Sequence, residues 1–137
     1  MESVVAKTFV KLNDSQKICL LLIDEVKIRP SVLLSGGFLS GKAMNQPTEK
    51  ASSMLGLMVR CLHGGPSFML RIIPVHRLDS KFQFDIVKDC AACLMKSGAD
   101  VIGSITDNHR INQQFCKLFN TIQPWKAVHP IDSSKVW

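Results

Sequence analysis

The 137-residue chain has no apolar run long enough to cross a membrane, because its longest run, residues 18–23, falls far short of the roughly 20 residues that a spanning helix needs. It also lacks internal repeats, low-complexity tracts and any linker long enough to divide it. With 46% hydrophobic residues, it is long enough for one compact domain and too short for two. The sequence therefore predicts a single folded domain without a membrane-spanning segment.

The start of the chain lacks the features of a secretory signal, since Glu2 places an acid where such signals are positively charged and little apolar sequence precedes Lys7. The five cysteines are odd in number and irregularly spaced, which predicts reduced intracellular thiols. We therefore expect a protein of the cytosol or the nucleus.

Basic residues outnumber acidic ones, with 17 Lys and Arg against 11 Asp and Glu and a formal net charge of +6 at pH 7. This balance favours polyanionic partners such as nucleic acid. No aromatic residues interleave with the basic ones as in a base-stacking surface, so DNA contact is expected at the phosphates, with steep salt dependence. The alternative is a solvated surface. The basic positions are dispersed along the chain: Lys27, Arg29, Lys42, Arg60, Arg71, Arg77 and Arg110.

The first half of the chain has the pattern of strands in antiparallel connection. Residues 17–28 are apolar on both alternating faces in their first half, which predicts a central strand covered on both sides. Short apolar segments at residues 31–34 and 38–39 flank Gly36 and Gly37, a pair that favours a tight hairpin. We therefore expect a central strand followed by a small hairpin.

A second hairpin is predicted beyond a polar surface loop at residues 40–53. Apolar runs at residues 54–62 and 67–75 are separated by His-Gly-Gly-Pro at residues 63–66, a sequence at which the chain turns back. The first half of the chain therefore supplies three main antiparallel strands.

The apolar spacing changes to that of a helix after residue 79. Ser80 and Gln83 form a capping box at its start, and Gly98 ends it. Its apolar positions recur at helical intervals, at Phe82, Ile86, Cys90, Cys93 and Leu94.

The last third of the chain has the pattern of strand, helix and strand. Residues 99–106 are typical of a buried strand, which a right-handed crossover through the preceding helix can lay parallel to a neighbouring strand. A second helix is predicted from Ile111 to residues 123–124, and residues 126–137 resemble the start of another strand. The expected fold class is therefore α/β with a mixed sheet.

Two aspartates occupy informative strand positions. Asp24 follows an apolar run on the most buried predicted strand, where an unpaired charge is unfavourable. Asp107 follows the strand at residues 99–106, and ligands of open α/β sheets gather at such carboxyl ends. If the strands are neighbours about 4.8 Å apart, both carboxylates would reach one hard cation at roughly 2.1 Å. The pair predicts a magnesium site, a type of centre that can support phosphodiester cleavage.

Structural roles for both aspartates remain open alternatives at this point. Asp107 precedes a predicted helix and would act as its N-cap. Asp24 would pair with Lys27 or Arg29, or mark an early end of its strand. Spacing alone does not separate the metal site from these roles.

Two sequence blocks carry a resemblance to a known family. The first is LIDEVKIR at residues 22–29, followed by the Gly-rich hairpin, and the second is SITDN at residues 104–108 with Asn112 four residues further on. From about Lys17 onward the chain resembles the ribonuclease H-like catalytic core of P-element-type transposases, which the THAP-containing transposase-derived proteins share. The resemblance implies a mixed sheet of three antiparallel strands, then alternating helices and parallel strands.

The resemblance also implies a function and a domain organisation. The first two catalytic acids of the family fall on Asp24 and Asp107, which would bind Mg²⁺ or Mn²⁺ for cutting and joining DNA in the nucleus. Residues 17–137 would form the N-terminal half of a ribonuclease H-like catalytic core, after an N-terminal extension at residues 1–16.

Departures from the family pattern predict a truncated and inactive core. The third acid, which the family supplies from a downstream helix, is missing, because the one acid after Asp107 is Asp132 in a turn-like sequence. The zinc-coordinating N-terminal DNA-binding module is missing as well. We expect weak metal binding, little or no transposase activity, and an open sheet edge near Val136 and Trp137 where a second copy would pair. The alternative is a non-catalytic DNA- or protein-binding remnant of a transposase.

Two short motifs suggest other functions but are expected to be structural. Residues 36–42 fit G-x-x-x-x-G-K, yet Ala43 replaces the Mg²⁺-binding hydroxyl and Pro47 interrupts the required helix, so a hairpin loop is predicted. Cys90 and Cys93 fit C-x-x-C but lie late in a helix on its apolar face, which favours core residues over a redox centre. The four scattered histidines predict no zinc site.

Overall fold

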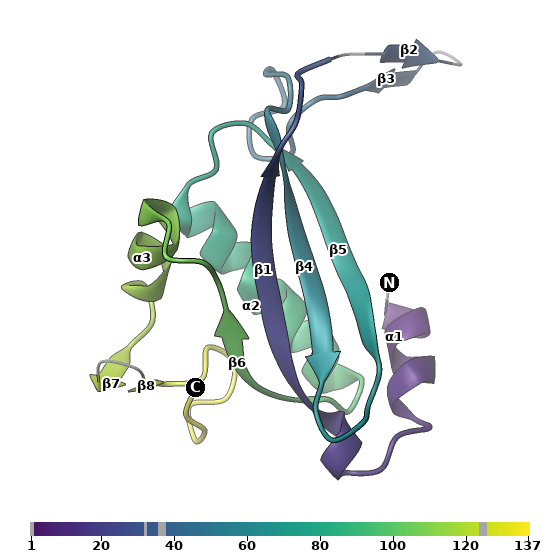
Figure 1. Cartoon of the computed structure of the whole chain (residues 1–137), viewed down its shortest axis with the longest axis vertical. Coiled ribbons are helices and arrows are strands. Elements are labelled where there is room, and N and C mark those ends of the chain that lie inside the picture. Colours follow the sequence, from purple (N-terminus) through teal and green to yellow (C-terminus); the bar gives the residue numbers. More distant parts are fainter. Residues whose placement is uncertain (1, 32, 36–37, 124–125) are drawn as a thin grey trace.

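The computed structural model of the chain describes residues 2–31, 33–35, 38–123 and 126–137. None of the described helices is both long and apolar enough to cross a membrane. The helices and strands are shown in Figure 1 and follow the order α1 (Glu2–Phe9), a 3-10 helix (Ser15–Lys17), β1 (Ile18–Lys27), β2 (Leu33–Ser35), β3 (Phe38–Ser40), β4 (Ser53–Cys61), β5 (Ser67–Val75), α2 (Ser80–Lys96), β6 (Asp100–Ile105), α3 (Arg110–Cys116), β7 (Thr121–Gln123) and β8 (Lys126–Ala127).

The central sheet has the strand order β5-β4-β1-β6. Strand β4 pairs antiparallel with both β1 and β5, whereas β6 lies parallel to β1 on its other side. Helix α2 makes the crossover from β5 to β6, which places the second half of the chain beside β1 (Figure 1). The predicted mixed sheet, with three antiparallel strands followed by a helix and a parallel strand, is confirmed.

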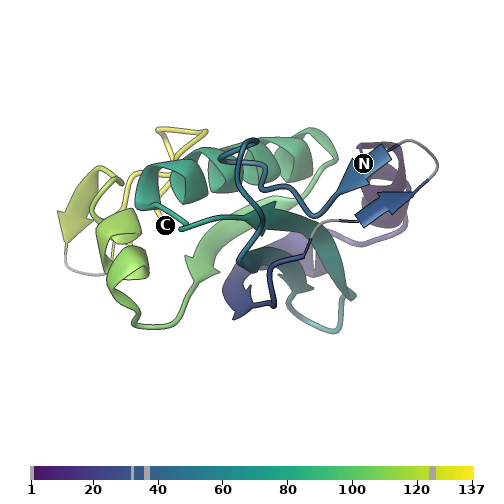
Figure 2. The same ribbon diagram turned by 90° about the horizontal axis from the view of Figure 1, so that it is seen from above.

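Helix α2 covers one face of this sheet (Figure 2). The alternate β1 residues Cys19, Leu21 and Ile23 are buried on that face. Cys90 and Leu94 of α2 belong to the same core cluster. The core therefore lies between the sheet and α2, as the helical spacing of the α2 apolar residues predicts.

No described helix covers the opposite face of the sheet (Figure 2), so the expected coverage of the first strand on both sides is wrong. Leu20 and Leu22 are only partly buried, and Val26 is 57% exposed. Apolar side chains on this face lie against neighbouring strands, as Leu20 does beside Gly103. Packing between neighbouring strands therefore explains why the apolar run of β1 is continuous although no second layer covers this face.

Helix α1 contributes to the same core as the sheet. Val5 and Phe9 are buried, and the Phe9 ring meets the edge of the Phe68 ring with 6.3 Å between centroids. The segment expected to be an N-terminal extension therefore packs on the domain. The boundary at residue 16 stays a prediction.

Helix α2 begins with Asp79 as its N-cap. The Asp79 carboxylate accepts a hydrogen bond from the backbone N–H of Phe82 at 2.9 Å. The predicted capping box of Ser80 and Gln83 is wrong, because Asp79 occupies the capping position and Gln83 is fully buried instead. Gly98, with φ at 90°, follows the last turn as predicted.

Helix α3 is shorter than predicted. It ends at Cys116 instead of residues 123–124, because the chain turns there and Thr121–Gln123 pairs as β7 with β8. Residue 124 lies outside the described residues.

The predicted strand at residues 126–137 is limited to β8. Further on, a turn reverses the chain, so that Val128 bridges Val136 and the backbones of Ala127 and Trp137 exchange two hydrogen bonds of 2.8 Å. The edge expected to be open near Val136 and Trp137 is therefore paired within the chain.

Candidate metal-binding site

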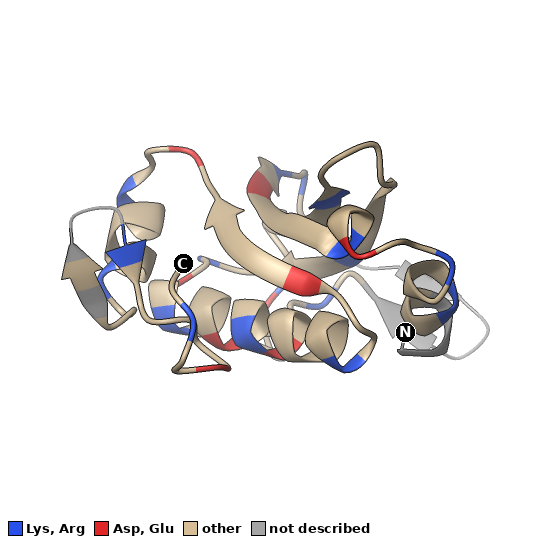
Figure 3. Cartoon of the chain, turned by 90° about the horizontal axis from the view of Figure 1, so that it is seen from below, with Lys and Arg blue, Asp and Glu red and all other residues tan. Residues whose placement is uncertain are grey.

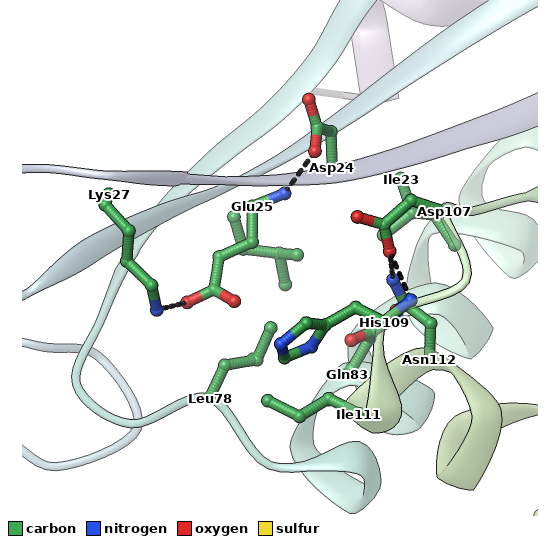
Figure 4. A pocket seen from close by; sticks show the side chains of 11 residues that line it. Ile23, Asp24, Glu25, Lys27, Leu78, Gln83, Asp107, His109, Ile111 and Asn112 are labelled. Carbon is green, nitrogen blue, oxygen red and sulfur yellow. Dashed lines mark hydrogen bonds and ion pairs between the residues drawn. The ribbon is translucent and has the colours of Figure 1, made fainter.

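Asp24 in β1 and Asp107 just after β6 lie at neighbouring positions of two adjacent parallel strands. Leu22 of β1 is in register with Ile105 of β6, and each aspartate lies two positions further along the chain. Both line one cavity of about 120 Å³, between the ends of β1 and β6 and the starts of α2 and α3 (Figure 4). The two acids singled out in the sequence therefore share one site.

The Asp24 side chain is exposed, contrary to the burial expected from its apolar neighbours. It leaves β1 on the side opposite to Glu25, and its Oδ1 accepts a hydrogen bond of 2.8 Å from the Glu25 backbone N–H (Figure 4). Strand alternation explains the exposure, because this side of β1 is not covered by α2. The alternative ion pair with Lys27 is wrong, and the described residues show no ion pair with Arg29 either.

Glu25 is an acid of the same cavity that the sequence analysis did not single out. Its Oε1 accepts hydrogen bonds from Ser53 Oγ at 2.5 Å and from Lys27 Nζ at 2.8 Å. Burial alone would raise the pKa of Glu25, but these two bonds together with the nearby positive charge of Lys27 hold the pKa below its usual value. Glu25 is therefore an ionised group that already has close partners.

Asp107 is held by two donors at the start of α3. Its Oδ1 accepts hydrogen bonds from the His109 backbone N–H at 3.0 Å and from Asn112 Nδ2 at 2.6 Å. These bonds lower the pKa of Asp107 below its usual value and keep its carboxylate ionised. The alternative role as N-cap of the helix is wrong, because His109 holds the N-cap position.

Gln83 reaches this site from α2 and was also missed as a functional residue. It is fully buried, lines the cavity, and donates through Nε2 to Asn112 Oδ1 at 2.7 Å. No sequence signal identified it, because a single Gln in the first turn of a helix is typical of capping. Asn112, by contrast, belongs to the sequence block that carries the family resemblance.

The donor set fits a hard divalent cation in part. Asp24 and Asp107 each use Oδ1 in the hydrogen bonds described, which leaves Oδ2 for a cation, although in Figure 4 the Oδ2 atom of Asp24 points away from Asp107. Within the described ranges, no three His, Cys, Asp or Glu side chains form a group that could hold a metal ion. Two carboxylates without a third acidic ligand predict weak affinity.

Asp132 does not join this site. Its Oδ1 accepts hydrogen bonds from Ser134, from the backbone N–H at 3.1 Å and from Oγ at 2.6 Å, as in a tight turn. The neighbouring Lys135 pairs at 2.6 Å with Asp100, the first residue of β6, whereas Asp107 follows the last. Asp132 therefore lies near the start of β6, away from Asp107, as expected for a residue that is a poor third ligand.

The two cysteines of the C-x-x-C motif are core residues. Cys90 and Cys93 are both buried and form no disulfide, and burial raises the pKa of Cys90 to about 11. A thiol with such a pKa stays protonated at neutral pH and is a poor nucleophile. The expectation that this motif is structural is therefore supported.

The G-x-x-x-x-G-K match does not open a helix. Its middle forms strand β3, and Lys42 bridges Lys50 across the following loop. Its first two residues, Gly36 and Gly37, lie outside the described residues. The part that is described has the hairpin-loop form expected from Ala43 and Pro47.

Basic residues are spread over the helices, strands and loops of the chain (Figure 3). Several carry local bonds, such as Arg60 to Ser67 Oγ at 2.8 Å and Lys81 to Asp85 at 3.4 Å. This distribution agrees with the dispersed pattern of the sequence.

The chain is similar to known transposase proteins in both sequence family and fold. A family model described as TNP-like, RNase H N-terminal domain matches residues 3–120. The solved structure of a Drosophila P element transposase strand transfer complex is similar to this chain, with a TM-score of 0.76 and 18% sequence identity over 97% of the chain. The chain spans 28% of the length of that transposase chain. No curated protein sequence matches significantly.

Proposed function

The chain belongs to the TNP-like RNase H N-terminal domain family, and from this premise we propose that it is the N-terminal part of a transposase catalytic core acting on DNA. The observation that supports this most is the position of Asp24 and Asp107, which lie on and just after two adjacent parallel strands and line one cavity. The fold alone, without acids at this edge of the sheet, would not support a proposal of catalysis on DNA.

The proposed cofactor is Mg²⁺ or Mn²⁺, held by Asp24 and Asp107. Carboxylate oxygens are the ligands that such hard cations prefer. When bound, the metal would activate a water or hydroxyl and stabilise the leaving oxygen of a phosphodiester. The role of this chain is to present two carboxylates at one edge of the sheet, and the hydrogen bonds at Asp107 favour its ionised form.

The proposed activity of the isolated chain is low. Glu25, the other acid of the cavity, is turned toward Ser53 and Lys27, and the described residues form no group of three metal-binding side chains, so the affinity for a divalent ion is expected to be weak. Measurable Mg²⁺-dependent DNA cleavage by this chain alone would overturn the proposal of an inactive fragment.

A second candidate function is a non-catalytic DNA- or protein-binding module. The lack of a three-ligand group among the described residues favours it, since such a module needs no complete metal centre. The net charge of +6 supports contact with DNA phosphates in the nucleus for either function. Self-association of the chain stays a prediction, and it would need a surface other than the edge at Trp137, which is paired within the chain.

Thermal melting with and without Mg²⁺ distinguishes the two candidates. At a Mg²⁺ concentration about ten times the dissociation constant, binding to the folded chain adds about 1.4 kcal/mol and raises the melting temperature by roughly 4 °C. Asp24→Asn should abolish this rise and, by removing one of two like charges, stabilise the metal-free fold. Asp85→Asn, an exposed α2 acid outside the cavity, is the control. A wild-type melting temperature that never responds to Mg²⁺ would eliminate the metal site.

A further inference from the structure

Three side chains from separate elements form a continuous hydrogen-bonded relay. Gln83 of α2 donates through Nε2 to Asn112 Oδ1 at 2.7 Å, and Asn112 of α3 donates through Nδ2 to Asp107 Oδ1 at 2.6 Å. Figure 4 shows Gln83 and Asn112 beside Asp107. The relay thus connects a buried core position with one of the proposed metal ligands.

The direction of the relay follows from the chemistry of its last member. An ionised carboxylate only accepts hydrogen bonds, so Asn112 must turn its NH₂ group toward Asp107. The Asn112 oxygen then faces Gln83, which must present its own NH₂ group. A flip of either amide would bring two acceptors or two donors together, so Asp107 sets both amide orientations.

Gln83 does not favour the stability of the fold, which suggests that its role is to contact a neighbouring residue. Its side chain is fully buried, yet its Oε1 has no hydrogen-bond partner among the described residues. An unsatisfied buried amide oxygen costs about 1–3 kcal/mol, whereas an apolar side chain of similar volume would pack here without that penalty. The bond to Asn112 is the one specific contact this amide makes in the described structure.

We infer that Gln83 is a positioning residue that, through Asn112, holds the exposed Asp107 carboxylate in one rotamer with Oδ2 turned to the cavity. Asp107 follows the end of β6 and is solvent-exposed, so its own packing does not select a rotamer. Hydrogen bonds to Oδ1 from both Asn112 and the His109 backbone fix the carboxylate before any ligand arrives. The value of this orientation for metal binding rests on the proposed function, but the orientation itself does not.

The first measurement is the Asp107 rotamer in the metal-free chain, from NMR couplings between Hα and the two Hβ protons in the presence of EDTA. Wild type should show the couplings of a single rotamer. Gln83→Met keeps the volume and removes the donor, so its couplings should converge toward an average while its unfolding free energy is unchanged or higher. A merely structural Gln83 would give the opposite, a less stable fold with an unchanged Asp107 rotamer, and this would overturn the inference.

Two further variants keep the test decisive. Gln83→Glu presents a carboxylate to Asn112 at neutral pH and should disorder Asp107, whereas protonation at low pH restores an O–H donor and should recover the single rotamer. Asn112→Leu removes the direct donor at a half-buried site and should reproduce the effect of Gln83→Met if the latter fails to fold. Gln114→Met, an exposed substitution on α3, is the matched control and should leave the couplings unchanged.

A Mg²⁺ titration then separates the relay from the proposed function. With a metal site at Asp107, Gln83→Met should raise the Mg²⁺ dissociation constant by roughly 10-fold, as loss of an outer hydrogen-bond partner does in other metal sites. If the variant disorders Asp107 while wild type binds no Mg²⁺, the relay stands and the metal-site proposal fails. If wild type binds Mg²⁺ and the Asp107 rotamer is the same in both proteins, the metal site stands and the relay fails.

Discussion

His129 and Trp137 donate hydrogen bonds to the same backbone oxygen. His129 Nε2 lies 3.1 Å and Trp137 Nε1 lies 2.9 Å from the carbonyl oxygen of Val101 in β6. The two rings also meet edge to face, with centroids 5.0 Å apart. Because β6 is an outer strand of the sheet, these two side chains fasten the C-terminal segment to the sheet edge.

The backbone around His129 selects its neutral form. Its Nδ1 faces the backbone N–H groups of Ile131 and Asp132, both at 3.1 Å, and must accept from them, so the proton resides on Nε2. Burial lowers the pKa of His129 below its usual value, and the nearby Lys135 charge acts in the same direction. Protonation of Nδ1 would place a donor against two donors.

We expect His129 to make the stability of the fold decline in mild acid. Since its native pKa is depressed, neutral His129 contributes fully above the unfolded-state pKa of about 6.5, and this contribution is lost as pH falls through the native pKa. Urea unfolding at about pH 7.5 and about pH 5.5 measures the decline, which His129→Gln should reduce. His63→Asn is the control, because His63 is exposed and Asn tolerates its φ of 52°. Identical pH dependence in wild type and His129→Gln would contradict the prediction.

An aromatic cluster should fix α3 against α2. Phe115 of α3 is fully buried and meets Phe84 of α2 edge to face, with centroids 6.3 Å apart. Phe115→Ala should lower the free energy of unfolding by about 3–5 kcal/mol, and Phe115→Leu by less, because it leaves a smaller cavity. Chemical denaturation measures both. Leu118→Ala, at a position 44% exposed, should change stability by less than Phe115→Leu, and a reversed order would refute this account of the packing.

Two substitutions at the start of α2 distinguish the observed N-cap, Asp79, from the predicted one, Ser80. Asp79→Ala should destabilise the fold by about 1 kcal/mol, because it removes the acceptor for the Phe82 backbone N–H. Ser80→Ala should have little effect, since Ser80 is the first residue inside the helix. Urea denaturation of the two variants compares them, and a larger loss for Ser80→Ala would restore the capping box.

These caps illustrate what sequence patterns can and cannot predict. The strands were predictable because apolar runs and Gly-rich turns are local signals, and the right-handed crossover predicted that β6 lies parallel to a neighbouring strand, which in the structure is β1. Asp24 and Asp107 could be singled out because each directly follows the apolar residues of a predicted strand, although β1 continues past Asp24 to Lys27. The surroundings of these two acids were not predictable. Side chains alternate between the two faces of a strand, and the sequence does not say whether Asp24 or Glu25 is the acid that faces α2.

The hydrogen bonds that connect Gln83, Asn112 and Asp107 could not be predicted from the sequence for a different reason. Twenty-nine positions separate Gln83 from Asn112, and only the packing of α2 against α3 brings their amides together. The fold of the C-terminal segment was hidden in the same way, because Val101, His129 and Trp137 meet only through tertiary contacts.

Glu25 should not act as the third metal ligand. Its carboxylate is turned toward Ser53 and Lys27, on the opposite side of β1 from Asp24 (Figure 4). Glu25→Gln should therefore keep the Mg²⁺-induced rise in melting temperature, whereas Asp107→Asn should lose it. Differential scanning fluorimetry with and without Mg²⁺ compares the two. Loss of the response in Glu25→Gln would make Glu25 a ligand.

DNA binding by this chain should depend steeply on salt and only slightly on DNA sequence. Contacts from dispersed Lys and Arg residues release counterions from the phosphates, so the logarithm of the affinity falls linearly with the logarithm of the salt concentration. Because the basic residues do not gather on one element (Figure 3), Arg60→Ala or Lys96→Ala should reduce that slope by about one unit at most. Fluorescence anisotropy with two unrelated duplexes across a salt series measures both properties. An affinity that differs strongly between the duplexes, or that one substitution abolishes, would instead indicate a localised base-reading surface.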